Sequence, residues 1–137
     1  MKRSIFAMLL TVLFLTGCVD NNKTSEWQLS PTFTKDSQVL HGTEGKFGMI
    51  NINGPDHPVF PAGQGRLYRM YFLEDLQEHS TFKITATHQD SENPEQLVET
   101  NIGDETEAKF GFDEAGLWKI EVFVDGDSYT DFIVEAN

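Results

Sequence analysis

The chain has 137 residues, and its 22 acidic residues outnumber its 10 basic residues to give a formal net charge of −12. This charge disfavours nucleic acid and anionic lipid headgroups as partners, because both are polyanions. The length predicts one domain with a sizeable core, and the single cysteine excludes an internal disulfide.

The N-terminus has the pattern of a secretory signal. Lys2 and Arg3 precede an apolar run over residues 5–15, which is too short for a membrane-spanning helix of about 20 residues. The run ends at Leu15-Thr16-Gly17 followed by Cys18, which resembles the lipobox of bacterial lipoproteins. The resemblance implies recognition of Leu15, Thr16 and Gly17 by a signal peptidase, cleavage before Cys18, and a diacylglycerol on the Cys18 sulfur.

This pattern divides the chain into three parts. Residues 1–17 are the predicted signal peptide, residues 18–26 the lipidated cysteine with a polar tether, and residues 27–137 the folded domain. Two acyl chains hold a protein stably on a membrane, so we expect Cys18 to anchor it to the extracytoplasmic face of the cell membrane. Removal of Lys2 and Arg3 leaves 8 basic and 22 acidic residues, a net charge of −14.

Beyond the tether, apolar and polar residues alternate with a period of two, which is typical of strands with one buried face. The strongest patterns cover residues 46–53, 66–73, 81–88 and 116–124. Asp125-Gly126 then predicts a hairpin into residues 129–134, because a type I′ turn requires positive φ at both central residues. Weaker patterns cover residues 39–41, 96–100 and 108–112.

No segment has sustained helical periodicity, although residues 74–79 could form one helical turn. About seven short antiparallel strands with frequent turns predict an all-β fold, an immunoglobulin-like β-sandwich, with a small barrel as the alternative.

Catalytic and metal-binding motifs are absent from the sequence. There is no G-x-S-x-G elbow, and the four histidines are dispersed with no H-x-x-x-H pair. The acidic loops at residues 103–107 and 125–127 do not match the twelve-residue calcium loop. His88 is best interpreted as a hydrogen-bonded histidine at a strand end. We therefore predict no catalytic residues, no metal and no cofactor.

Aromatic residues are abundant enough to fill a core and to leave some for a surface. The strand over residues 66–73 carries bulky side chains on both faces, and Arg and Tyr are enriched at protein interfaces. A partner surface is predicted at Tyr68, Arg69, Tyr71, Phe123 and Tyr129.

Short motifs in a characteristic order extend over the whole predicted domain. They are Trp27, Ser30-Pro31-x-Phe33, Gly42-Thr43-Glu44-Gly45-Lys46, Ala62-Gly63-x-Gly65, Tyr71-Phe72, Gly116-x-Trp118-Lys119 and Asp125-Gly126. In these motifs the chain resembles a family of small lipoproteins and exported proteins of bacilli and their relatives, defined by a domain of unknown function. The resemblance implies an immunoglobulin-like sandwich and no catalytic assignment. Residues 89–107 are more acidic than the family pattern.

The favoured function is that of a non-enzymatic module that binds a protein or polymer of the cell envelope; its oligomeric state is left open. One alternative is a protease inhibitor acting through the loop at residues 53–64, which Pro55, Pro58 and Pro61 stiffen. Another alternative is a carboxylate-based hydrolase of envelope polymers.

Overall fold

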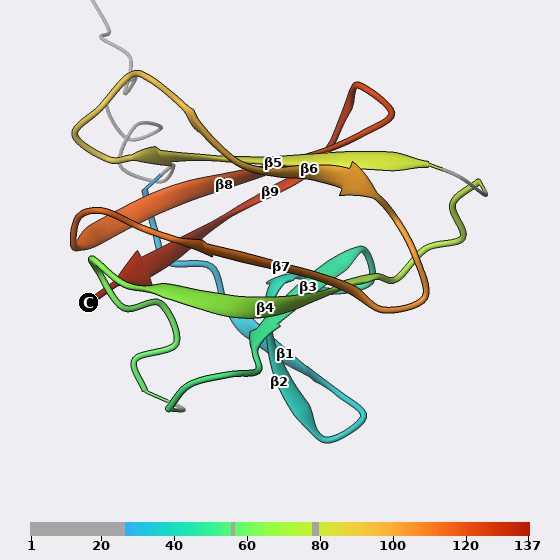
Figure 1. Ribbon diagram of the computed structural model, residues 1–137, viewed down its shortest axis with the longest axis horizontal. Coiled ribbons are helices and arrows are strands. Elements are labelled where there is room, and N and C mark those ends of the chain that lie inside the picture. Colours follow the sequence, from blue (N-terminus) through green and yellow to red (C-terminus); the bar gives the residue numbers. More distant parts are fainter. Residues whose placement is uncertain (1–26, 56, 78–79) are drawn as a thin grey trace, which may run out of the picture.

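A computed structural model describes residues 27–55, 57–77 and 80–137. The predicted signal peptide, Cys18 and the tether lie outside the described residues. In the described part of the chain, nine strands form two antiparallel sheets that pack face to face, and no helix is present (Figure 1). It therefore also contains no helix with the length and hydrophobicity needed to cross a membrane.

The first sheet contains five strands in the order β1-β2-β3-β4-β7. Their bounds are β1 Thr32–Lys35, β2 Gln38–Thr43, β3 Phe47–Asn51, β4 Gly65–Phe72 and β7 Thr106–Gly111. The second sheet has the order β6-β5-β8-β9. Its strands are β5 Thr81–His88, β6 Glu95–Asn101, β8 Gly116–Val124 and β9 Asp127–Ala136.

The strand order confirms the immunoglobulin-like sandwich. In the first sheet, β3, β4 and β7 take the places of strands A, B and E of an immunoglobulin domain. In the second, β6, β5, β8 and β9 take the places of C′, C, F and G. The β1–β2 hairpin extends the first sheet beyond the position of strand A.

Each strong sequence pattern coincides with a strand, and residues 81–88 and 116–124 alternate between buried and more exposed positions as a strand with one buried face requires. Phe82, Ile84 and Ala86 of β5 are buried, as are Trp118, Ile120 and Val122 of β8. The hairpin at Asp125-Gly126 is also confirmed, with φ of 51° and 87° at these residues. A hydrogen bond from the Thr81 N–H to Asp125 Oδ1 (2.9 Å) ties this turn to β5 and lowers the pKa of the Asp125 carboxyl.

Strand β1 was not predicted, which is why the sequence indicated fewer strands than the structure contains. Its turn into β2 consists of Asp36 and Ser37, with φ of 50° and 68°, so it has the positive φ values of a type I′ turn without a glycine. The suggested helical turn is also wrong where the structure describes it, because residues 74–77 are irregular.

Aromatic rings fill much of the space between the sheets. Phe47 of β3 lies 5.8 Å from Phe132 of β9, and Phe72 of β4 lies 5.1 Å from Phe82 of β5, measured between ring centroids. Tyr68 stacks between Phe60 and Phe110, at 5.5 and 4.6 Å. Ring contacts that cross from one sheet to the other therefore contribute to the core.

Candidate functional site

The structure divides the predicted partner surface among several environments. Tyr68 is fully buried, and its hydroxyl donates to the Val59 carbonyl (2.9 Å), so its assignment to a surface was wrong. Arg69 and Tyr71 lie on the outer face of the first sheet, where Arg69 pairs with Glu107 (2.6 Å) and the Tyr71 hydroxyl donates to Gln38 (3.1 Å).

The other two residues lie elsewhere. Phe123 is on the outer face of the second sheet, beneath the Lys83 ammonium, which is 5.0 Å from the ring centroid. Tyr129 packs against the core, and its hydroxyl is shared between the Lys46 carbonyl (3.1 Å) and Glu74 (3.0 Å). Burial, together with the Glu74 carboxylate, raises the pKa of Tyr129 to about 12. The five residues therefore do not form one surface.

His88 is the strand-end histidine that the sequence predicted. It is buried, its Nε2 lies 2.9 Å from the Ala115 carbonyl oxygen, and its Nδ1 accepts a hydrogen bond from the Asp90 N–H (3.0 Å). Among residues 27–55, 57–77 and 80–137, no group of three or more His, Cys, Asp or Glu side chains is arranged to hold a metal ion.

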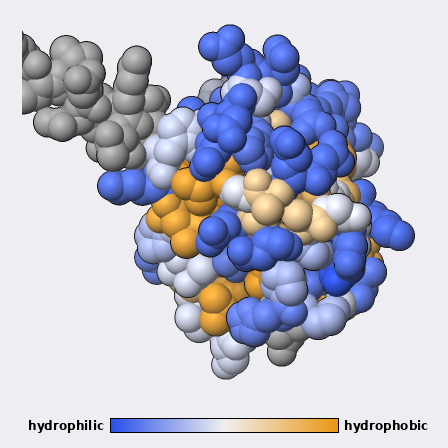
Figure 2. Space-filling view, turned by 90° about the vertical axis from the view of Figure 1, so that its left-hand side faces the viewer, coloured by the Kyte–Doolittle hydropathy of each residue, from blue (hydrophilic) through white to orange (hydrophobic). Residues whose placement is uncertain are grey.

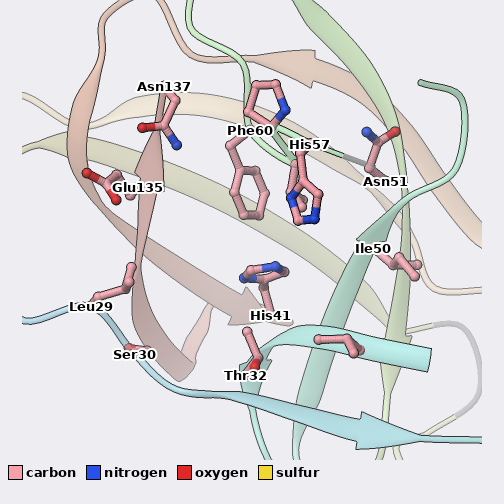
Figure 3. Close-up of a pocket in the computed structure, with 13 residues that line it drawn as sticks. Leu29, Ser30, Thr32, His41, Ile50, Asn51, His57, Phe60, Glu135 and Asn137 are labelled. Atoms are coloured by element: carbon pink, nitrogen blue, oxygen red, sulfur yellow. The ribbon is translucent and has the colours of Figure 1, made fainter. Parts of the chain in front are cut away.

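The best candidate site is a cavity of about 560 Å³ at one open edge of the sandwich, within the size range of small-molecule sites. We call it the edge groove. It lies between β2 and β3 of the first sheet and β9 of the second (Figure 3). Its lining residues are Leu29, Ser30, Thr32, Val39, His41, Ile50, Asn51, His57, Pro58, Val59, Phe60, Glu135 and Asn137.

The edge groove forms where two strands from different sheets separate. At the other end of this edge, β2 and β9 are joined by a hydrogen bond between the Thr43 and Thr130 hydroxyls (2.8 Å). Toward Val39 on β2 and Glu135 on β9, the space between the strands is instead open and lined by the loop before β4. Phe60 of that loop is buried and lines the groove.

Apolar side chains at the groove are unusually exposed. Leu29 and Val39 are 55% and 54% exposed, and they are the large hydrophobic residues that the described part of the chain leaves most open to solvent. Both line the edge groove. Figure 2 shows hydrophobic patches between hydrophilic residues on the side of the molecule that carries the C-terminus. Exposed apolar surface gathered at a cavity is typical of a binding site.

The polar side chains of the groove point into it from several elements. The rings of His41 and His57 lie beside Phe60 in the middle of the cavity, and Glu135 and Asn137 form another wall (Figure 3). The His41 ring meets the Phe60 ring edge-on, with centroids 4.9 Å apart. Among residues 27–55, 57–77 and 80–137, no lysine or arginine lines the groove, and Glu135 is the acidic side chain that does.

Burial lowers the pKa of His41, which makes stability depend on pH. Above the ordinary histidine pKa of about 6.5, both folded and unfolded chains hold a neutral imidazole. As the pH falls below this value, the unfolded chain binds a proton before the folded chain does, so the free energy of unfolding decreases. The contribution of this one proton is at most about 1.4 kcal/mol per pH unit.

We therefore expect His41→Gln to weaken the acid dependence of stability between pH 6.5 and pH 5. Urea unfolding of the purified chain and the variant at several pH values measures this change. Data at pH 8, where the imidazole is neutral, give the baseline cost of the substitution. An identical pH dependence in the two chains would contradict the assignment.

The loop proposed for protease inhibition, residues 53–64, is only partly exposed. Residues 53–55 and 57 are exposed, whereas Phe60 and Pro61 are buried and Val59 packs against the core. This anchoring builds one wall of the edge groove. Sequence analysis missed the groove because its residues come from five short segments that share no motif.

The comparisons with known proteins bear on the fold. A crystal structure of a candidate lipoprotein from Bacillus anthracis superimposes with a TM-score of 0.66 at 20% sequence identity, over 88% of this chain and 94% of that chain. No protein-family model and no curated protein matches the chain. The two chains therefore share a fold.

Proposed function

We propose that this protein is an extracytoplasmic lipoprotein, anchored to the cell membrane through Cys18, that binds a component of the cell envelope in the edge groove. The observation that carries the binding role is the position of Leu29 and Val39. The two most exposed large apolar side chains of the described residues line the same cavity. Burying about 50–100 Å² of apolar surface there contributes on the order of 1–3 kcal/mol to binding.

The anchoring role is supported by the lipobox at residues 15–18 and by the shared fold with the Bacillus anthracis protein. The length of the tether limits how far the groove can lie from the membrane. Nine residues, from Cys18 to Glu26, separate the predicted lipid from Trp27, and they span at most about 30 Å when fully extended. Leu29 follows shortly after, so the groove would lie near the membrane surface.

The anchor is tested by metabolic labelling with an alkyne fatty acid, followed by membrane fractionation. We expect the label and the membrane association of the wild-type chain to be lost in Cys18→Ala. Labelling that persists in this variant would contradict the assignment of Cys18.

The binding role is tested by cross-linking in cells and mass spectrometry. We expect the anchored protein to enrich a specific envelope component, and Val39→Asp to reduce that enrichment by at least tenfold, since the new carboxylate would be desolvated by any apolar contact. Lys119→Ala, on the outer face of the second sheet, serves as the matched control. Equal enrichment by Val39→Asp and the wild type would contradict the role of the groove.

A further inference from the structure

We infer that the ligand of the edge groove is a short extended peptide, neutral or basic in charge, that pairs with the backbone of Glu135 as an added strand. This inference rests on the proposed binding role of the groove and specifies its ligand. It comes from the hydrogen-bonding pattern along the outer edge of β9, the last strand of the second sheet.

Two segments of the chain already pair with this edge. The Ser30 N–H donates to the Ile133 carbonyl (3.1 Å), and the Ile133 N–H donates to Ser30 Oγ (2.9 Å). Four residues further on, the Asn137 N–H donates to the Phe60 carbonyl (2.9 Å), and the Ala62 N–H donates to the Asn137 carbonyl (2.8 Å). Ile133 and Asn137 therefore direct their backbone groups away from β8.

Glu135 lies between these two residues, and the period of the strand fixes its orientation. Alternate residues of a strand direct their N–H and C=O groups to the same side, so those of Glu135 also point away from β8. The register agrees, because Ile133 pairs with Lys119 and Glu135 pairs with Leu117, two residues along each strand. No residue of the described ranges forms a hydrogen bond with the Glu135 backbone on that side.

These backbone groups of Glu135, which have no partner among the described residues on that side, border the edge groove. Glu135 and Asn137 line the groove, as do Leu29 and Ser30. An exposed donor and acceptor on a strand edge form a template for another strand, and peptides are commonly bound in this way. From Ile133 to Asn137 the strand advances by four residues, or about 13 Å. The unpaired stretch between these two residues therefore accommodates about three residues of ligand.

The side chains around the gap define what the peptide carries. Leu29 and Val39 offer apolar contact to one side chain of the peptide. Successive side chains of a strand point to opposite faces, so the side chains on either side of this one would face away from the groove. The described residues that line the groove include Glu135 and no lysine or arginine, in a chain with a net charge of −12. An acidic peptide would be repelled, whereas a basic residue next to the paired position would be attracted to Glu135.

The experiment is a selection of random heptapeptides on the full-length lipoprotein in nanodiscs, with Val39→Asp protein for counter-selection. The affinity of the selected peptides is then measured by fluorescence anisotropy. We expect peptides with an apolar residue flanked by neutral or basic ones, whose affinity falls at least tenfold with Val39→Asp. Methylation of the one backbone nitrogen that donates to Glu135 should weaken binding about tenfold, and methylation at the adjacent nitrogen should not.

Charge is tested with Glu135→Lys, which should reduce the affinity for basic peptides and leave the backbone pairing of neutral ones in place. The inference is overturned if no peptide is selected, if acidic peptides predominate, or if methylation has the same effect at every nitrogen. If no peptide binds but the cellular cross-link still depends on Val39, for example with a glycan polymer, the strand-pairing inference fails and the proposed function stands. If neither depends on Val39, both fail.

Discussion

Phe47→Ala should lower the free energy of unfolding by about 3–5 kcal/mol, a large part of the roughly 5–15 kcal/mol that stabilises a domain of this size. Phe47 is fully buried on β3. The centroid of its ring lies 5.1 Å from that of Phe72 on the same sheet and 5.8 Å from that of Phe132 on the opposite sheet. The substitution therefore removes a contact that joins the sheets and leaves a cavity at the centre of the core.

Thermal unfolding should show this loss as a decrease in Tm of about 12–20 °C, at about 4 °C per kcal/mol. The matched control is Phe47→Leu, which keeps most of the buried volume and should lose less than half as much. A decrease smaller than about 1 kcal/mol for Phe47→Ala would mean that the ring does not hold the sheets together.

Gly42→Ala should lower the free energy of unfolding by about 3–5 kcal/mol, through displacement of the backbone and not through lost contacts. A Cβ at Gly42 would lie 2.2 Å from the Phe47 carbonyl oxygen, and both are backbone positions of paired strands. The two strands cannot move apart without lengthening the hydrogen bonds between them. The loss of stability therefore exceeds that caused by an ordinary overpacked side chain.

Gly45→Ala, in the turn between the same strands, is the control that measures the cost of an unfavourable backbone conformation without a steric clash. Gly45 has φ of +84°, but a Cβ there would meet no atom within 4 Å. We expect its substitution to cost about 1–2 kcal/mol from the left-handed conformation alone. Chemical denaturation of both variants measures the difference, and equal costs would contradict the steric argument.

Much of the fold could be predicted from alternation, because a strand with one buried face records that face in its sequence. This is why β5 and β8 have the predicted bounds. The same logic separates Tyr68 from Arg69 and Tyr71, since adjacent residues of a strand point to opposite faces. The prediction of a single partner surface overlooked that consequence, and the structure places Tyr68 in the core.

Strand β1 and the edge groove could not be predicted for different reasons. The β1–β2 turn places Asp36 and Ser37 at positive φ, so it lacks the glycine by which a type I′ turn is usually recognised in a sequence. The groove depends on how far apart two sheets lie at one edge, and no local pattern records that distance. Leu29 and Val39 are exposed because the sheets separate there. The sequence does not show this separation, so it does not distinguish these two residues from buried apolar side chains.

The hydrogen bonds between Ser30 and Ile133 also have a mechanical consequence. Ser30 is the first residue of the described part of the chain that bonds to a strand, so a pulling force applied through the N-terminal segment would reach these two bonds before it reached the β1–β2 hairpin. Their rupture would leave the backbone groups of Ile133, like those of Glu135, without a partner among the described residues on that side. Tension on the tether would thus lengthen the unpaired stretch of β9 while the core of the sandwich stayed intact.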